Sequence, residues 1–264
     1  MDTLHDWVDY DSLNWYGLNT NPNAIYLLQE NPDKINWIQL SQNPNAIEML
    51  EENLDKVEWA LLSLNKNAIH ILEKNLDKIN WIFLSSNPNA IHLLRENPNK
   101  INWLELCYNK NGVEILRENP NKIFWSALSR NPNAIDLLEE NQDKIDWVEL
   151  SHNPNALHLL VANQDKIDWI QLSRNPKAID LLKKNPDKIN WSQLSNNPGA
   201  IELLEANKNK IDWLMLSYNP NAINLIKTNL DKVNWSALSL NPLIFSDSFI
   251  YSYSKKHNSE YVLK

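Results

Sequence analysis

Apolar and polar positions follow a pattern that recurs every 22 residues along most of the chain. Residues 43–64, taken as one unit, read NPNAIEMLEENLDKVEWALLSL, and the consensus is N-P-N-A-I-x-L-L-x-x-N-x-D-K-I-x-W-x-x-L-S-x. Tryptophans mark the period without a single insertion, at positions 15, 37, 59, 81, 103, 125, 147, 169, 191, 213 and 235. A fixed period of this length is typical of a solenoid.

The first half of each unit carries the apolar spacing of an α-helix. In the unit 43–64, Ala46, Ile47 and Leu50 fall on one helical face. Asn43 is a good N-cap, and the proline after it suits the first helical position. Asn53 lies where a helix stops with a residue in the left-handed conformation. We therefore predict a nine-residue helix, with asparagine as the cap at one end and as the stop at the other.

The second half predicts a shorter helix around the tryptophan. The residue before the tryptophan is usually Asn or Asp, such as Asn36 or Asp146, which indicates another N-cap. With Asn36 as the cap, Ile35 and Leu40 have the spacing of a hydrophobic staple. We expect a short extended link through Lys-Ile and then a helix of one to two turns.

A leucine-rich repeat is the alternative, with Ile-x-Trp as a strand. Two features argue against it. One leucine position of that pattern is serine at 126, 192 and 236, and proline usually follows the asparagine. We therefore predict an all-α solenoid of about ten two-helix repeats.

The ends of the chain depart from the consensus, as capping repeats do. We predict a capping half-repeat at 1–20, tandem repeats over 21–240, a C-terminal cap at 241–254 and a polar tail at 255–264. In the C-terminal cap, we expect the last core face to be covered by Phe245, Phe249, Ile250 and Tyr251. Such an array should be elongated.

The composition of the chain argues against several classes of function. The chain has 264 residues, of which 43% are hydrophobic, and its net charge of −8 does not attract nucleic acid or anionic lipid. Three glycines argue against phosphate loops and dinucleotide folds. The single cysteine excludes an internal disulfide and fits a reducing compartment. We expect no signal peptide, because the first residues contain no apolar region of the kind that such peptides have. We also expect no membrane span, because the sequence has no apolar run of 18 residues.

Blocks such as NPNAIHLLRENPNKINWLEL at 87–106 and NPNAIDLLEENQDKIDWVELS at 131–151 resemble a known group of proteins. These are the Asn-Pro/Trp tandem-repeat proteins that giant DNA viruses of protists encode in multiple copies. The resemblance covers about residues 13–242. It implies an intracellular, viral setting, in the host cytoplasm or a virion, and no particular chemistry.

Several columns of the repeat contain residue types that could bind a ligand. In each case, however, the surrounding sequence favours a structural role. The tryptophans are expected in the core, because a thin repeat needs a large buried anchor. The lysine column, such as Lys34 and Lys56, could follow phosphates, but an Asp or Asn precedes each lysine. We expect these lysines to bond the last carbonyls of the first helix. His70, His92 and His158 share a column but lie in different repeats, too far apart to share a zinc ion.

No catalytic motif or metal-binding pattern stands out, and Cys107 replaces a serine of the repeat. An active site needs a unique constellation, whereas these polar columns repeat. We therefore expect no enzymatic activity, no cofactor and no metal.

Two columns of the second helix vary between units and are placed on its outward side, opposite the Trp-Leu core. They hold large apolar residues that soluble surfaces rarely carry without a purpose. The candidate partner-binding residues are Leu61, Leu64, Phe83, Tyr108, Met215 and Tyr218.

The sequence thus predicts a non-catalytic scaffold that binds a protein along the outward face of the second helices. One alternative is a structural protein, such as a virion component, that associates head to tail. The other is a nucleic-acid binder that uses the lysine column, which the acidic net charge disfavours.

Overall fold

A computed structural model describes residues 4–245, and repeated pairs of short α-helices run through all of that range. Within these residues there is no strand, only an isolated antiparallel bridge between Leu4 and Phe245. The predicted all-α solenoid is therefore confirmed. The leucine-rich alternative was wrong, because it requires a strand in every repeat.

The odd-numbered helices begin at the repeat tryptophans. They are α1 (Trp15–Leu18), α3 (Trp37–Leu40), α5 (Trp59–Leu64), α7 (Trp81–Ser86), α9 (Trp103–Tyr108), α11 (Trp125–Ser129), α13 (Trp147–His152), α15 (Trp169–Leu172), α17 (Trp191–Ser195), α19 (Trp213–Ser217) and α21 (Trp235–Leu238).

The even-numbered helices begin after the Asn-Pro-Asn-Ala segment. They are α2 (Ile25–Glu30), α4 (Ile47–Glu51), α6 (Ile69–Glu73), α8 (Ile91–Glu96), α10 (Val113–Glu118), α12 (Ile135–Glu139), α14 (Leu157–Ala162), α16 (Ile179–Lys184), α18 (Ile201–Glu205) and α20 (Ile223–Lys227). A 3-10 turn such as Pro98–Lys100 or Pro186–Lys188 follows most of them. Of the extended link expected through Lys-Ile, the lysine ends this turn and the isoleucine, such as Ile101, is extended.

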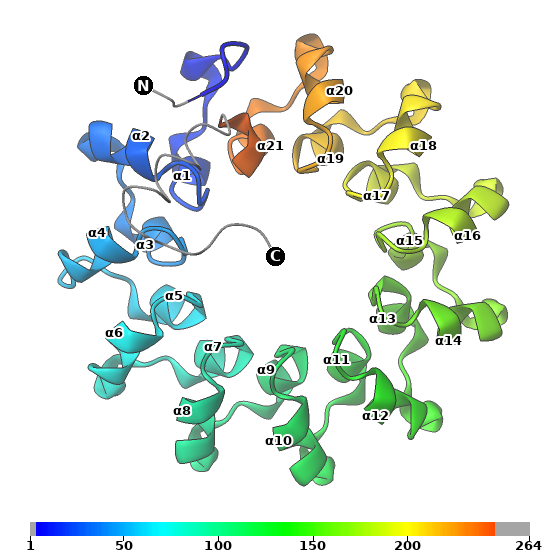
Figure 1. Ribbon diagram of the computed structural model, residues 1–264, viewed down its shortest axis with the longest axis horizontal. Coiled ribbons are helices and arrows are strands. Elements are labelled where there is room, and N and C mark those ends of the chain that lie inside the picture. The colour runs from blue at the N-terminus through cyan, green and yellow to red at the C-terminus, as the bar shows by residue number, and fades with distance from the viewer. Residues whose placement is uncertain (1–3, 246–264) are drawn as a thin grey trace, which may run out of the picture. The chain divides into compact units, whose positions relative to one another are not determined.

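Contacts divide the chain into two compact units. The central unit is Glu58–Asp212, and the split unit combines Met1–Val57 with Trp213–Lys264. In the central unit, α5, α7, α9, α11, α13 and α15 pack on one another in sequence. They belong to the inner row of a curved array whose outer row holds the even-numbered helices (Figure 1).

The core consists of aliphatic columns from both rows. Leucines of the Leu84 type in the odd-numbered helices and of the Leu94 type in the even-numbered helices are fully buried, as is Ala90 just before α8. Sealing one such leucine away from water stabilises the fold by about 1.5–3 kcal/mol. Each thin repeat therefore depends on its neighbours for burial.

The predicted caps of the odd-numbered helices are confirmed. Oδ1 of Asn80 accepts a hydrogen bond from the Phe83 amide at 3.2 Å, and Asp168 caps α15 through the Gln171 amide at 2.8 Å. A buried serine at the end of most odd-numbered helices then links the repeats. Oγ of Ser63 donates to the Trp59 carbonyl and accepts from the Asn80 amide, at 2.8 and 3.1 Å.

The first asparagine column does not cap the even-numbered helices, so that prediction was wrong. Helix α8 begins three residues later than expected, and its N-cap position is Ala90, which has no side-chain bond. Asn87 is buried; its Oδ1 accepts from the Asn89 amide, and its Nδ2 donates to the carbonyls of Ser63 and Asn65 in the preceding repeat. The column is an asparagine ladder between repeats.

The second asparagine column is not left-handed, so the predicted left-handed stop was also wrong. Asn97 has φ −127° and ψ 58°, and the left-handed region requires a positive φ. Its Nδ2 donates to the Leu93 carbonyl at 2.9 Å and so caps the C-terminus of α8 with a side chain.

The first and last repeats meet inside the split unit, although we expected an elongated array with separate ends. Nδ2 of Asn21 donates to the carbonyls of Ser239 and Asn241, and the His5 amide donates to the Ile244 carbonyl. Phe245 is buried. The other expected cap residues, Phe249, Ile250 and Tyr251, and the polar tail lie outside the described residues.

Candidate functional site

Four exposed aliphatic side chains of the central unit share one position, directly after the repeat tryptophan. Ile82, Leu104, Val148 and Ile170 are 42–53% exposed, and we call these four residues the aliphatic column. They lie on α7, α9, α13 and α15, which are in the inner row (Figure 1). The same position in the split unit holds the exposed Tyr16, Ile38 and Leu214.

Helix geometry explains this exposure. On α7, Leu84 is fully buried, and Ile82 precedes it by two positions, or about 200° around the helix, which turns Ile82 away from the side that carries Leu84. The aliphatic column therefore exposes large apolar side chains at the same position of four repeats, and recurring exposed apolar surface is a feature of protein contact sites.

The sequence-predicted site residues lie partly off this surface. Tyr108 in the central unit and Tyr218 in the split unit are exposed. By contrast, Leu61, Leu64, Phe83 and Met215 are half-buried. The outward side had been placed one residue too far along the helix, because the tryptophan was assumed to mark the centre of the buried side.

Basic residues lie beside the aliphatic column at the ends of the odd-numbered helices. Arg130, His152 and Arg174 occupy one position in three consecutive repeats, and Arg130 pairs with Glu149 at 3.6 Å. Burial, and after it the positive charges of Arg130 and Arg174, lower the pKa of His152 to about 4. Nδ1 of His152 is buried and has no hydrogen-bond partner. His152 is therefore neutral near pH 7.

The tryptophans are half-buried rather than part of the core, so the predicted core column was wrong. In eight repeats, the lysine of the next repeat lies over the indole ring, with Nζ 4.4–5.0 Å from the ring centroid. Such cation–π contacts contribute about 0.5–1 kcal/mol at exposed sites. The lysines thus stack on the neighbouring repeat instead of bonding helix carbonyls, as we had expected.

Histidines and the cysteine make structural contacts. Nε2 of His92 lies 2.7 Å from Glu73, and His158 pairs with Glu139 at the same distance. Cys107 is buried, which raises the pKa of its thiol, and its sulfur accepts a hydrogen bond from the Phe124 amide. Within residues 4–245, no three His, Cys, Asp or Glu side chains group as metal ligands.

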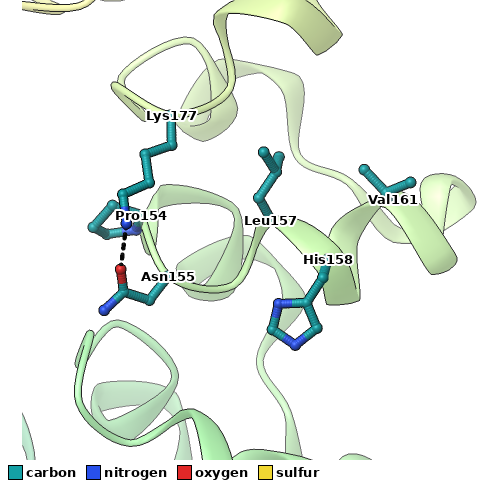
Figure 2. A pocket seen from close by; sticks show the side chains of 6 residues that line it. All are labelled: Pro154, Asn155, Leu157, His158, Val161 and Lys177. Carbon is teal, nitrogen blue, oxygen red and sulfur yellow. Dashed lines mark hydrogen bonds between the residues drawn. The ribbon is translucent and has the colours of Figure 1, made fainter.

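An open pocket lies at α14 of the central unit. It is lined by Pro154, Asn155, Leu157, His158, Val161 and Lys177. Figure 2 shows Lys177 reaching Asn155, and the hydrogen bond from its Nζ to Oδ1 is 2.7 Å long. Because these two polar groups bond each other, and His158 bonds Glu139, the pocket offers few polar groups aimed at a ligand.

No protein-family model, curated protein or solved structure matches this chain. The resemblance to viral repeat proteins therefore stays an expectation. None of the helices in residues 4–245 is both long and apolar enough to cross a membrane.

Proposed function

We propose that this protein is a non-catalytic scaffold and that a protein partner binds across its aliphatic column. The observation that carries the proposal is the recurrence of half-exposed Ile, Leu and Val side chains at one position of the inner-row helices. Exposed apolar surface of this kind is retained where another molecule covers it. Repeat arrays often present a binding surface across several units.

Charge favours a protein over a nucleic acid. The chain carries a net charge of −8, and eight of its lysines are stacked on tryptophan rings. A nucleic-acid surface needs several basic groups aimed at phosphates. Binding through the aliphatic column would depend only weakly on salt, whereas binding through the lysines would fall steeply with it.

The resemblance to viral repeat proteins suggests where this partner would be met, in the host cytoplasm or in a virion. The absence of catalysis belongs to the proposal as well. The polar columns repeat from unit to unit, and an active site requires groups that occur together once.

The proposal can be tested by replacing Ile82, Leu104 and Ile170 with Ser together. These side chains are half-exposed, so the thermal midpoint should fall little. A partner recovered with the parent chain should bind the triple variant at least roughly 30-fold more weakly, the equivalent of about 2 kcal/mol at hot spots.

The matched control replaces Leu76 and Val161 with Ser. Both are as exposed as the column but lie outside it. The control should bind the partner like the parent chain. Equal binding by the triple variant, with its fold retained, would eliminate the aliphatic column as the site.

A further inference from the structure

The joint between the first and last repeats uses the same bonds as a joint between consecutive repeats. The Asn14 amide donates to Ser239 Oγ at 2.8 Å, as the Asn80 amide donates to Ser63 Oγ. Nδ2 of Asn21 donates to two carbonyls, those of Ser239 and Asn241, and thereby continues the asparagine ladder.

Two further contacts repeat the interior pattern. Nδ2 of Asn23 donates to the Pro242 carbonyl at 2.8 Å, just as Asn45 does to Pro22 at 2.9 Å. Oγ of Ser236 bonds the cap residue Asn14 at 2.6 Å, and the interior counterpart is Ser126 with Asp146 at 2.7 Å. The last repeat therefore bonds the first repeat in the same way that an interior repeat bonds the next one.

The end joint is weaker than the interior joints. Interior repeats are linked by the chain itself, whereas the partners here are more than 200 residues apart. Ser12 stands where the repeat has lysine, so among the described residues Trp235 has no cation over its ring. Within residues 4–245, the end joint has in addition the backbone bond from His5 to Ile244 and the Leu4–Phe245 bridge.

We propose that the end joint is an exchangeable interface whose other occupant is a second copy of this chain. When the joint opens, the first repeat of one copy can bind the last repeat of another through the same hydrogen bonds. Exchange of identical elements is a low-cost route to dimers and longer assemblies. Closure within one chain wins at low concentration, because the tethered ends have an effective concentration near the millimolar range. This proposal does not depend on the proposed function.

A disulfide across the joint tests the proposal. A Cβ added at Gly17 would lie 3.7 Å from the Ser239 Cβ, within the roughly 3.5–4.5 Å that a disulfide spans. The nearest other atom is the flexible end of Leu240, at 3.2 Å. The variant carries Gly17→Cys and Ser239→Cys, with Cys107→Ser to remove the native thiol.

The protein is held at about 0.5 mM, near the effective concentration of the ends, in urea below the unfolding midpoint. It is then returned to buffer and sized by chromatography with light scattering. The parent chain should yield dimers and higher multiples. The oxidised variant should yield at least about tenfold fewer, a difference of about 1.4 kcal/mol in assembly free energy, and reduction should restore them.

The matched control is Ala127→Cys, which pairs with the native Cys107 at the equivalent positions of two consecutive repeats. Once oxidised, it should form multimers like the parent chain. Multimers that form equally in the locked variant would overturn the proposal, as would their absence from the parent chain.

A second measurement does not require the locked variant to fold. Parent chains labelled separately with donor and acceptor dyes are mixed and treated in the same way. Energy transfer should grow with concentration, and Asn21→Ala, which removes two bonds of the end joint, should accelerate its growth. The interior counterpart Asn109→Ala should not. No transfer, or equal rates in the two variants, would contradict exchange at this joint.

Discussion

Asparagine has two roles in each repeat, and burial separates them. Asn131 is 1% exposed, and its side chain makes three hydrogen bonds, two of them to the preceding repeat. Asn141 is half-buried; its Nδ2 donates to the Leu137 carbonyl, and its Oδ1 accepts a hydrogen bond from the exposed Lys144. A buried carbonyl that loses its donor costs far more than one that water can reach.

The ladder asparagine should therefore matter more than the capping one. We expect Asn131→Ala to lower the free energy of unfolding by about 2–4 kcal/mol, and Asn141→Ala by about 0.5–1.5 kcal/mol. Urea unfolding followed by circular dichroism measures both. Equal losses would show that the ladder contributes no more than a helix cap.

Glycine at position 141 tests the backbone conformation. Because φ of Asn141 is −135°, glycine has no steric advantage there. Asn141→Gly should lower the unfolding free energy by about 1–2 kcal/mol, through the lost hydrogen bond and the added freedom of the unfolded chain. A gain in the thermal midpoint would instead indicate a left-handed position.

His152 should make the free energy of unfolding depend on pH. Its folded-state pKa of about 4 lies below its ordinary value of 6.5, so protons bind the unfolded chain more tightly. The unfolding free energy should fall as the pH drops from 6.5 towards 4, and this contribution should level off below pH 4. In His152→Asn, which copies Asn196 of a later repeat, thermal melts should lose this part of the pH slope. An unchanged slope would assign it to other groups.

At the scale of the element, α11 differs from its neighbours because Phe124 holds the cap position. It makes no side-chain cap bond, and the side chain is 51% exposed. Phe124→Asn should raise the free energy of unfolding by about 0.5–2 kcal/mol, because it restores the cap while little buried surface is lost. Phe124→Ala is the control and should give no gain in urea unfolding; a gain as large as that of Asn would refute the capping explanation.

Local features of the helices could be predicted from the sequence. The 22-residue period is visible in the sequence itself. The two helices per repeat and caps such as Asn36 and Asp146 could be predicted because they depend on residues at most four positions away. The asparagine ladder and the stacking of Lys78 on Trp59 could not be predicted, because both depend on how one repeat is placed against the next. The prolines suggested a helix start at residues such as Pro88, whereas Asn87 holds them in a turn.

The candidate surface was only half predicted for a related reason. The sequence identified the odd-numbered helices and the exposed Tyr108 and Tyr218, but it missed Ile82 and Ile170. The signal was present in the recurring Ile, Leu and Val after the tryptophan. It was not used because the tryptophan was assumed to lie in the core.

At the scale of the whole molecule, the end joint had no local signature. Its partners lie more than 200 residues apart, and the degraded half-repeat at residues 1–20 suggested a cap. The sequence did show that both ends keep polar residues of the repeat consensus. These are Asn14 and Asn21 at one end and Ser239 and Asn241 at the other. Across the joint, Asn14 and Asn21 donate hydrogen bonds, and Ser239 and Asn241 accept them.

The central claim is that a protein partner covers the aliphatic column. Amide hydrogen exchange of the chain, alone and with its recovered partner, tests it most directly. We predict that exchange in α7, α9, α13 and α15 slows by about tenfold or more in the complex, while α8, α10, α14 and α16 are unchanged. Protection confined to the even-numbered helices, or to the end joint, would contradict the account.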